Sequence, residues 1–134
     1  MIDGINHIGL AVRSIDDTIA KWRAFMAVEE IGRAEYPDMG QTSALIRLGE
    51  SSYFELMEPL GEKGVVYEFL MKNGEGFHHV SLHSQALEPD CAAMAASGVK
   101  ILGDSRGPIV FAHPKSMNGL LCEINECGNA KVDI

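Results

Sequence analysis

The chain repeats one arrangement of residues, and this repeat constrains its fold more than any other feature. His7 and His79 each begin an apolar run, and Glu55 and Glu123 each lie inside a later one. The two histidines are 72 residues apart in the sequence and the two glutamates 68. A motif that recurs with such a period predicts a repeated structural unit. Two imidazoles and two carboxylates, one pair per unit, are also a ligand set for a divalent metal ion.

The run around His7 has the alternation of a β-strand. In residues 5–12, the bulky side chains of Ile8, Leu10 and Val12 share one face, and His7 lies on the other among small residues. Small neighbours leave open space in front of the imidazole, which a binding cavity requires. The pattern therefore predicts a strand that packs under a helix on one side and presents His7 on the other.

The two glutamates are placed in their strands in the same way. Glu55 alternates with Phe54 and Leu56, and Glu123 alternates with Cys122. Each carboxylate thus faces away from the most apolar stripe of its own strand. If the sheet curls, all four candidate ligands can point into one concave space.

The remaining pattern completes two similar modules. Ser14 with Asp17 three residues later predicts a helix start, and further helices are expected near 64–73 and 86–97. We expect a single domain over 1–134, with modules at about 4–60 and 76–126, and a mobile tail after Glu126. Beyond 5–12, strands are predicted at 42–48, 52–58, 78–83, 99–102, 108–112 and 119–125.

Composition narrows the class of protein. The chain has 134 residues, of which 46% are hydrophobic and 22% charged, which is typical of a soluble globular protein. The net charge of −8 argues against a nucleic-acid partner. No apolar run reaches the roughly 20 residues of a membrane span, and the first residues lack the features of a signal peptide. Three cysteines without CxxC spacing, Cys91, Cys122 and Cys127, indicate reduced thiols and a cytoplasmic location.

Five segments together resemble the vicinal oxygen chelate superfamily, also called the glyoxalase and dioxygenase superfamily, and within it the methylmalonyl-CoA epimerases. The resemblance covers about residues 4–126, and its most specific parts are a GEG segment followed by two histidines and an HPKS segment. It implies an α+β fold in which two βαβββ modules form a cupped mixed sheet around a metal site. The five segments are His7–Val12, Phe54–Leu60, Gly74–Val80, Phe111–Ser116 and Gly119–Glu123.

The resemblance also implies a site and a reaction. It assigns the metal ligands to His7, Glu55, His79 and Glu123, with Co, Mn, Ni or Zn as the bound ion. The implied reaction is epimerisation of methylmalonyl-CoA or a related acyl-CoA. Glu123 would remove the α-proton as well as bind the metal, through a metal-stabilised enolate. A homodimer is possible by the same resemblance.

Two departures from the epimerase pattern keep other functions open. Ser43 stands where some epimerases carry a second catalytic glutamate, and the loop before the HPKS segment is short, reduced to Ser105–Pro108. An alternative is therefore a glyoxalase-like isomerase or lyase of the same fold that acts on another small carbonyl substrate. A third class is a non-enzymatic binding protein, although the intact ligand set argues against it.

Several other polar residues have ordinary structural interpretations. His78 alternates with His79 and is expected to pack or form a hydrogen bond, whereas His83 is either near the site or exposed. Glu58 is expected to be a solvated carboxylate. Arg47 and Lys115 could hold a substrate anion, as could Arg106, but isolated basic residues are usually surface residues.

Overall fold

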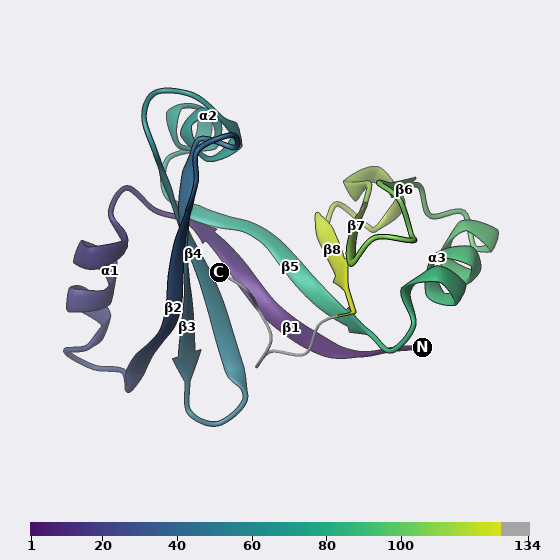
Figure 1. Ribbon diagram of the computed structural model, residues 1–134, viewed down its shortest axis with the longest axis horizontal. Coiled ribbons are helices and arrows are strands. Elements are labelled where there is room, and N and C mark those ends of the chain that lie inside the picture. The colour runs from purple at the N-terminus through teal and green to yellow at the C-terminus, as the bar shows by residue number, and fades with distance from the viewer. Residues whose placement is uncertain (127–134) are drawn as a thin grey trace. The chain divides into compact units, whose positions relative to one another are not determined.

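A computed structural model describes residues 1–126 of the chain (Figure 1). Its order of elements is βαβββ, then one helix, then βαβββ again, so the repeated modules and the α+β class are confirmed. The first module holds β1 (Ile2–Ala11), α1 (Ile15–Trp22), β2 (Val28–Tyr36), β3 (Gln41–Leu48) and β4 (Ser52–Pro59). After α2 (Val65–Asn73), the second holds β5 (Gly76–Ser84), α3 (Leu87–Ala96), β6 (Ile101–Leu102), β7 (Ile109–Ala112), a 3-10 turn η1 (Pro114–Ser116) and β8 (Cys122–Asn125).

The eight strands hydrogen-bond in one mixed sheet, in the order β2-β3-β4-β1-β5-β8-β7-β6. The β5–β8 pairing is parallel, and the pairings β2–β3, β3–β4, β6–β7 and β7–β8 are antiparallel. In packing, the chain forms two compact units. Unit one comprises residues 1–8 and, within the described chain, 79–126, and unit two comprises 9–78.

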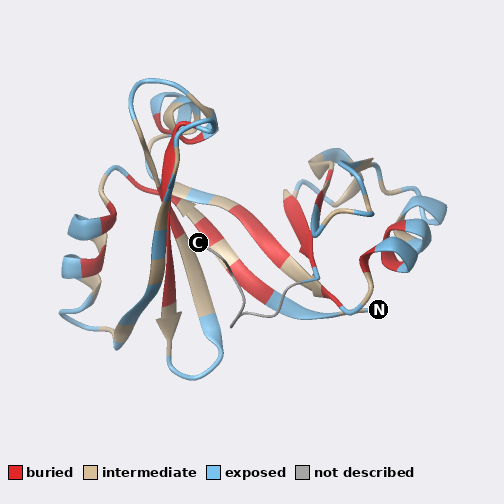
Figure 2. Cartoon of the chain, in the orientation of Figure 1, coloured by how far each residue is buried: buried red, intermediate tan, exposed pale blue. Residues whose placement is uncertain are grey.

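The strand β2 was not predicted from the sequence. It is an edge strand, exposed over much of its length, and its pairing with β3 shifts register between Glu30 and Gly32. Charged side chains and a bulge remove the regular alternation on which the sequence prediction depended. Its neighbour β3 is buried from Gln41 to Ile46, a contrast visible in Figure 2.

The core of unit two lies between α1 and one face of the strands β3 and β4. Ser14 starts the helix as predicted, because its hydroxyl accepts a hydrogen bond from Asp17 N at 3.1 Å. Ile15 and Ile19 then face the sheet, where they are buried. The cluster contains Val12, Ile15, Ile19, Ala44, Ile46 and Leu56.

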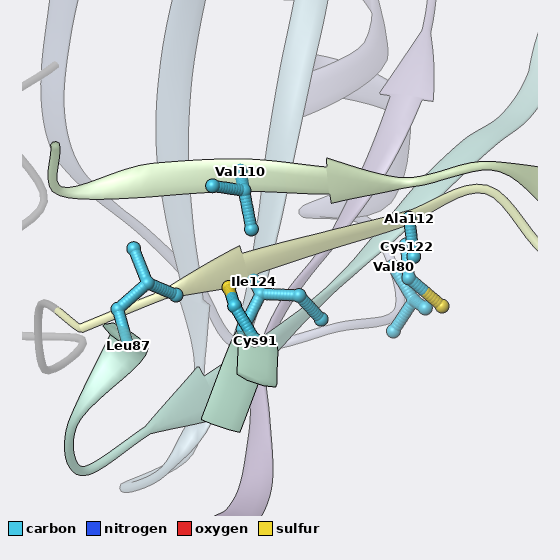
Figure 3. Packing of buried hydrophobic residues seen from close by; sticks show 7 residues of the cluster. All are labelled: Val80, Leu87, Cys91, Val110, Ala112, Cys122 and Ile124. Atoms are coloured by element: carbon cyan, nitrogen blue, oxygen red, sulfur yellow. The ribbon is translucent and has the colours of Figure 1, made fainter. Parts of the chain in front are cut away.

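The core of unit one packs α3 against one face of β5, β7 and β8 (Figure 3). Cys122 and Ile124 of β8 are both fully buried in it, as the strand phase predicted. The side chains that alternate with them, including Glu123, therefore lie on the opposite face. The cluster is completed by Val80, Leu87, Cys91, Val110 and Ala112.

A pair of glutamates caps one helix in each module. Glu58 Oε1 accepts a hydrogen bond from Ile15 N at 2.9 Å, and Glu126 Oε1 accepts one from Leu87 N at 2.6 Å. These amides belong to the first residues of α1 and α3, where the helix has no acceptor of its own. The interpretation of Glu58 as a merely solvated carboxylate is therefore wrong.

The second module differs in detail from its prediction. The strand expected at 99–102 is reduced to β6, and the hairpin connection contains the η1 turn. In that turn His113 Nδ1 accepts a hydrogen bond from Lys115 N at 3.1 Å, and Ser116 Oγ accepts one from Lys100 N at 3.0 Å. The HPKS segment thus builds a turn. Among the described residues, no helix has the length and apolar character needed to cross a membrane.

Candidate metal centre

Three of the four predicted ligands lie together in unit one. His7 comes from β1, His79 from β5 and Glu123 from β8, and all three side chains are buried. One nitrogen or oxygen of each lies within 4.8 Å of the others. His7 Nε2 is 3.3 Å from His79 Nε2 and 3.5 Å from Glu123 Oε2. Residues that are far apart in the sequence thus form one compact donor set.

The spacing of these atoms suits a first-row divalent cation. Ligand atoms about 2.1 Å from such an ion lie about 3.0 Å apart in octahedral geometry and about 3.4 Å apart in tetrahedral geometry. The distance of 3.3 Å from His7 Nε2 to His79 Nε2 lies in this range, and the distance of 3.5 Å to Glu123 Oε2 is slightly above it. Within the described chain, Glu123 Oε2 is buried without a hydrogen-bond partner, a costly arrangement that a bound cation would relieve. The residues present therefore fit a metal ion.

Asn6 fixes which nitrogen of His7 faces the site. Its amide oxygen Oδ1 lies 2.9 Å from His7 Nδ1. Because an amide oxygen only accepts hydrogen bonds, Nδ1 must donate, and the lone pair of the neutral ring is then on Nε2. That nitrogen is the one directed at His79 and Glu123. Such a supporting partner is a regular feature of metal-binding histidines.

The neighbours of Glu123 within the sheet form the walls of the site. Glu123 is paired with Ser81 on β5 and with Phe111 on β7, so the three side chains share one face. The Phe111 ring lies edge-on to His79, with 6.3 Å between ring centroids. Ser81 is fully buried. Asn6, Ser81 and Phe111 were not among the predicted site residues. Strand alternation with His79 could have identified Ser81, whereas the position of Phe111 depends on the β7–β8 register.

The fourth predicted ligand, Glu55, lies on β4 in unit two and is half-buried. It shares a face of the β3–β4 hairpin with Ser43, because the register pairs Ser43 with Met57 and Leu45 with Glu55. This face is opposite the one that α1 covers. Ser43 is almost completely buried, and its Oγ accepts a hydrogen bond from Gln41 Nε2 at 3.1 Å.

The two other histidines of β5, His78 and His83, have their own contacts. The His78 ring packs edge-on against Phe69 of α2, with 5.1 Å between ring centroids, in agreement with its expected packing role. His83, two residues after Ser81, bonds through Nδ1 to Asp3 Oδ1 at 2.6 Å. This contact lowers the pKa of the Asp3 carboxyl.

Two of the three basic residues considered as anion ligands pair with carboxylates on the surface. Arg47 bonds to Glu29, and Arg106 to Asp104 at 2.8 Å. Each pairing raises the pKa of the guanidinium through a side-chain hydrogen bond. Lys115 is exposed on the η1 turn.

Cys91 and Cys122 are the cysteines that the described residues contain. Cys91 and Cys122 are free and buried, and burial raises the pKa of both thiols. Cys122 is thus the small core residue that the sequence predicted. Cys127 and the tail that was expected to be mobile lie outside the described residues.

The chain combines two βαβββ modules with a buried His–His–Glu cluster whose donor atoms fit a metal ion. The chain belongs to the Glyoxalase/Bleomycin resistance protein/Dioxygenase superfamily, whose family model matches residues 6–113. The resemblance stated from the motifs is thereby confirmed.

Within this superfamily, the chain is similar to proteins that are named methylmalonyl-CoA epimerases. Ethylmalonyl-CoA/methylmalonyl-CoA epimerase of Cereibacter sphaeroides is 30% identical, over 94% of this chain and 99% of its own. A Streptomyces coelicolor methylmalonyl-CoA epimerase variant in complex with 2-nitronate-propionyl-CoA has a TM-score of 0.81 and 31% identity, with 92% and 96% of the two chains covered. A methylmalonyl-CoA epimerase in complex with methylmalonyl-CoA and ammonium has the same TM-score and identity, with 92% and 94% covered.

Proposed function

We propose that this chain is a divalent-metal-dependent epimerase of methylmalonyl-CoA or a related acyl-CoA. The observation that carries the proposal is the buried cluster of His7, His79 and Glu123. Several relatives of this chain are named methylmalonyl-CoA epimerases, which supports an epimerase-like isomerase. Their names include both ethylmalonyl and methylmalonyl thioesters, and this supports an acyl-CoA substrate with an acidic α-proton.

The metal would be held by His7, His79 and Glu123, with Glu55 as the proposed fourth ligand. Two imidazoles and one carboxylate suffice for a catalytic site and leave positions for substrate. The mixed N and O set suits Co, Mn, Ni or Zn. A bound cation would stabilise the negative charge that develops on the thioester oxygen. Asn6 would hold the His7 ring in the orientation this requires.

The proton transfer is assigned to Glu123. Its carboxylate would take the hydrogen from carbon 2 as a proton, while the electrons of that C–H bond move toward the thioester carbonyl. A second acid must return a proton to the opposite face of carbon 2, which gives the other epimer, and Glu123 then releases the proton that it took before the next cycle. Burial of Glu123 and the adjacent Phe111 ring would keep bulk water away from the negative charge that develops during this step.

The proposal also includes the number of domains, the oligomeric state and the location of the protein. A single domain over 1–134 predicts one cooperative unfolding transition. A homodimer is expected by resemblance, and its measurement is the molar mass in solution. A cytoplasmic location is expected from the cysteine pattern.

The test follows exchange at carbon 2. Metal-loaded protein is incubated with methylmalonyl-CoA in heavy water, and deuterium uptake is measured by mass spectrometry. Glu123→Gln should reduce the rate about 10²- to 10⁴-fold, because it removes the general base. His78→Ala, a change outside the cluster, should leave exchange intact. Equal exchange by wild-type protein and Glu123→Gln would refute the assigned role.

Ser43 supports one alternative, a glyoxalase-like isomerase or lyase that acts on another small carbonyl substrate. Inversion requires an acid on the second face, and a buried serine is a poor proton donor at neutral pH. The alternative predicts metal binding without exchange into methylmalonyl-CoA.

A further inference from the structure

Two buried side-chain oxygen atoms of unit one lie on the neighbouring strands β5 and β8. Ser81 Oγ and Glu123 Oε2 both lack a hydrogen-bond partner among residues 1–126. Ser81 is fully buried and Glu123 is 8% exposed. Buried polar groups almost always find partners, because the loss of water is otherwise not compensated. The presence of two such groups on paired residues indicates that they serve a function.

The two groups are chemically complementary. Ser81 and Glu123 are paired in the parallel register of β5 and β8, so their side chains leave the same face of the sheet from adjacent strands. A serine hydroxyl can donate a hydrogen bond, and an ionised carboxylate can only accept. Glu123 is itself a proposed metal ligand, and Ser81 lies two positions after another proposed ligand, His79, on the same face of β5.

The repeat shows that this hydroxyl is specific to the second module. His7 and His79 are 72 residues apart, and the residue 72 positions before Ser81 is Gly9. The carboxylate of the first module, Glu55, therefore has a glycine in place of this serine. The hydroxyl accompanies only the carboxylate that is proposed to move a proton as well as bind the metal.

We propose that Ser81 is a positioning residue for Glu123. In the metal-bound site its hydroxyl donates a hydrogen bond to the Glu123 carboxylate, which fixes the orientation of that side chain toward the cation and the substrate. This inference rests on the proposed metal site. It assigns to Ser81 no contact with substrate, so its effect passes through Glu123 alone.

The experiment compares two buried serines of the same strand. Ser84 is as completely buried as Ser81, but its hydroxyl donates to Asp90 Oδ2 at 2.5 Å. Affinity for Co²⁺ is measured by competition with a chelator and by the visible absorption of the bound ion. Thermal unfolding is measured on the metal-free protein.

The two alanine variants should change different quantities, Co²⁺ affinity for Ser81 and thermal stability for Ser84. Ser81→Ala should lower Co²⁺ affinity roughly tenfold to a hundredfold, as for other groups that orient metal ligands. Its unfolding temperature should be unchanged or higher, because the lost hydroxyl has no partner in the described structure. Ser84→Ala should unfold at a lower temperature and bind Co²⁺ like wild type. Ser81→Thr should restore affinity, and if it does not fold, Ser81→Cys should give an intermediate affinity.

The failures can be told apart. Wild-type protein that binds no Co²⁺ contradicts both the metal site and the role of Ser81. If wild type binds and Ser81→Ala binds equally well, only the role of Ser81 is refuted. An increase in KM without a change in Co²⁺ affinity also refutes it, because Ser81 would then contact substrate directly.

Discussion

Removal of the Asn6 side chain should weaken metal binding without unfolding the protein. In the structure, Asn6 Oδ1 accepts a hydrogen bond from His7 Nδ1 at 2.9 Å, and both residues are almost completely buried. Asn6→Ala deletes the group that holds the ring with Nε2 toward His79 and Glu123. Loss of such a partner typically reduces metal affinity about 10- to 100-fold, which corresponds to about 1.4–2.7 kcal/mol.

The same change has a separate effect on folding. The Nδ1–H group of His7 would lose this acceptor at a buried position, at a cost of about 1–3 kcal/mol. Asn6→Asp is the matched variant, because a carboxylate accepts the same hydrogen bond and adds a negative charge near the cation. It should bind Co²⁺ at least as tightly as wild type.

The assay is a Co²⁺ titration against a competing chelator at fixed pH, accompanied by thermal unfolding of each metal-free variant. The expected order of affinity is Asn6→Asp, then wild type, then Asn6→Ala. Two results would show the reasoning to be wrong. One is folded Asn6→Ala with wild-type affinity. The other is an equal loss in both variants, since the acceptor would then be irrelevant.

Three further predictions concern other parts of the chain. Glu126→Ala should destabilise the protein by about 0.5–2 kcal/mol, as measured by urea unfolding. The loss should exceed that of Glu58→Ala, because Ser14 also caps α1 whereas the residue before α3 provides no side-chain cap. Cys91 and Cys122 should resist iodoacetamide at pH 8 until the protein unfolds, since burial raises their pKa and restricts access; peptide mapping that finds either labelled in native protein would contradict this. Ser43→Glu should accelerate deuterium exchange into methylmalonyl-CoA and Ser43→Gln should not, if the missing acid limits epimerisation.

The candidate site was predictable as far as its residues follow strand alternation. The phase that places Glu123 opposite Cys122, and His79 opposite His78, depends only on the two-residue period of a strand. The structure bears out both assignments. The predicted helix start at Ser14 is likewise a local property, since the cap and the amide that it accepts from are three residues apart.

Other features depend on contacts that the sequence does not encode locally. Glu58 and Glu126 cap helices that begin about 40 residues earlier, and only the folded chain brings them to those amides. Alternation also predicts that Asn6 points away from its neighbour His7, yet the two side chains are hydrogen-bonded. The edge strand β2 was missed because its bulge disrupts the periodicity.

The repeat links the scaffold to the proposed chemistry. The first residues of the capped helices, Ile15 and Leu87, are related by the same 72 residues as the two histidines, and their caps, Glu58 and Glu126, by the same 68 as the two glutamates. The spacing of the candidate ligands is therefore a property of the whole module. A duplicated module by itself would give two equivalent carboxylates. A difference between the proposed roles of Glu55 and Glu123 must then arise where the modules differ, and the replacement of Gly9 by Ser81 in the second module is one such difference.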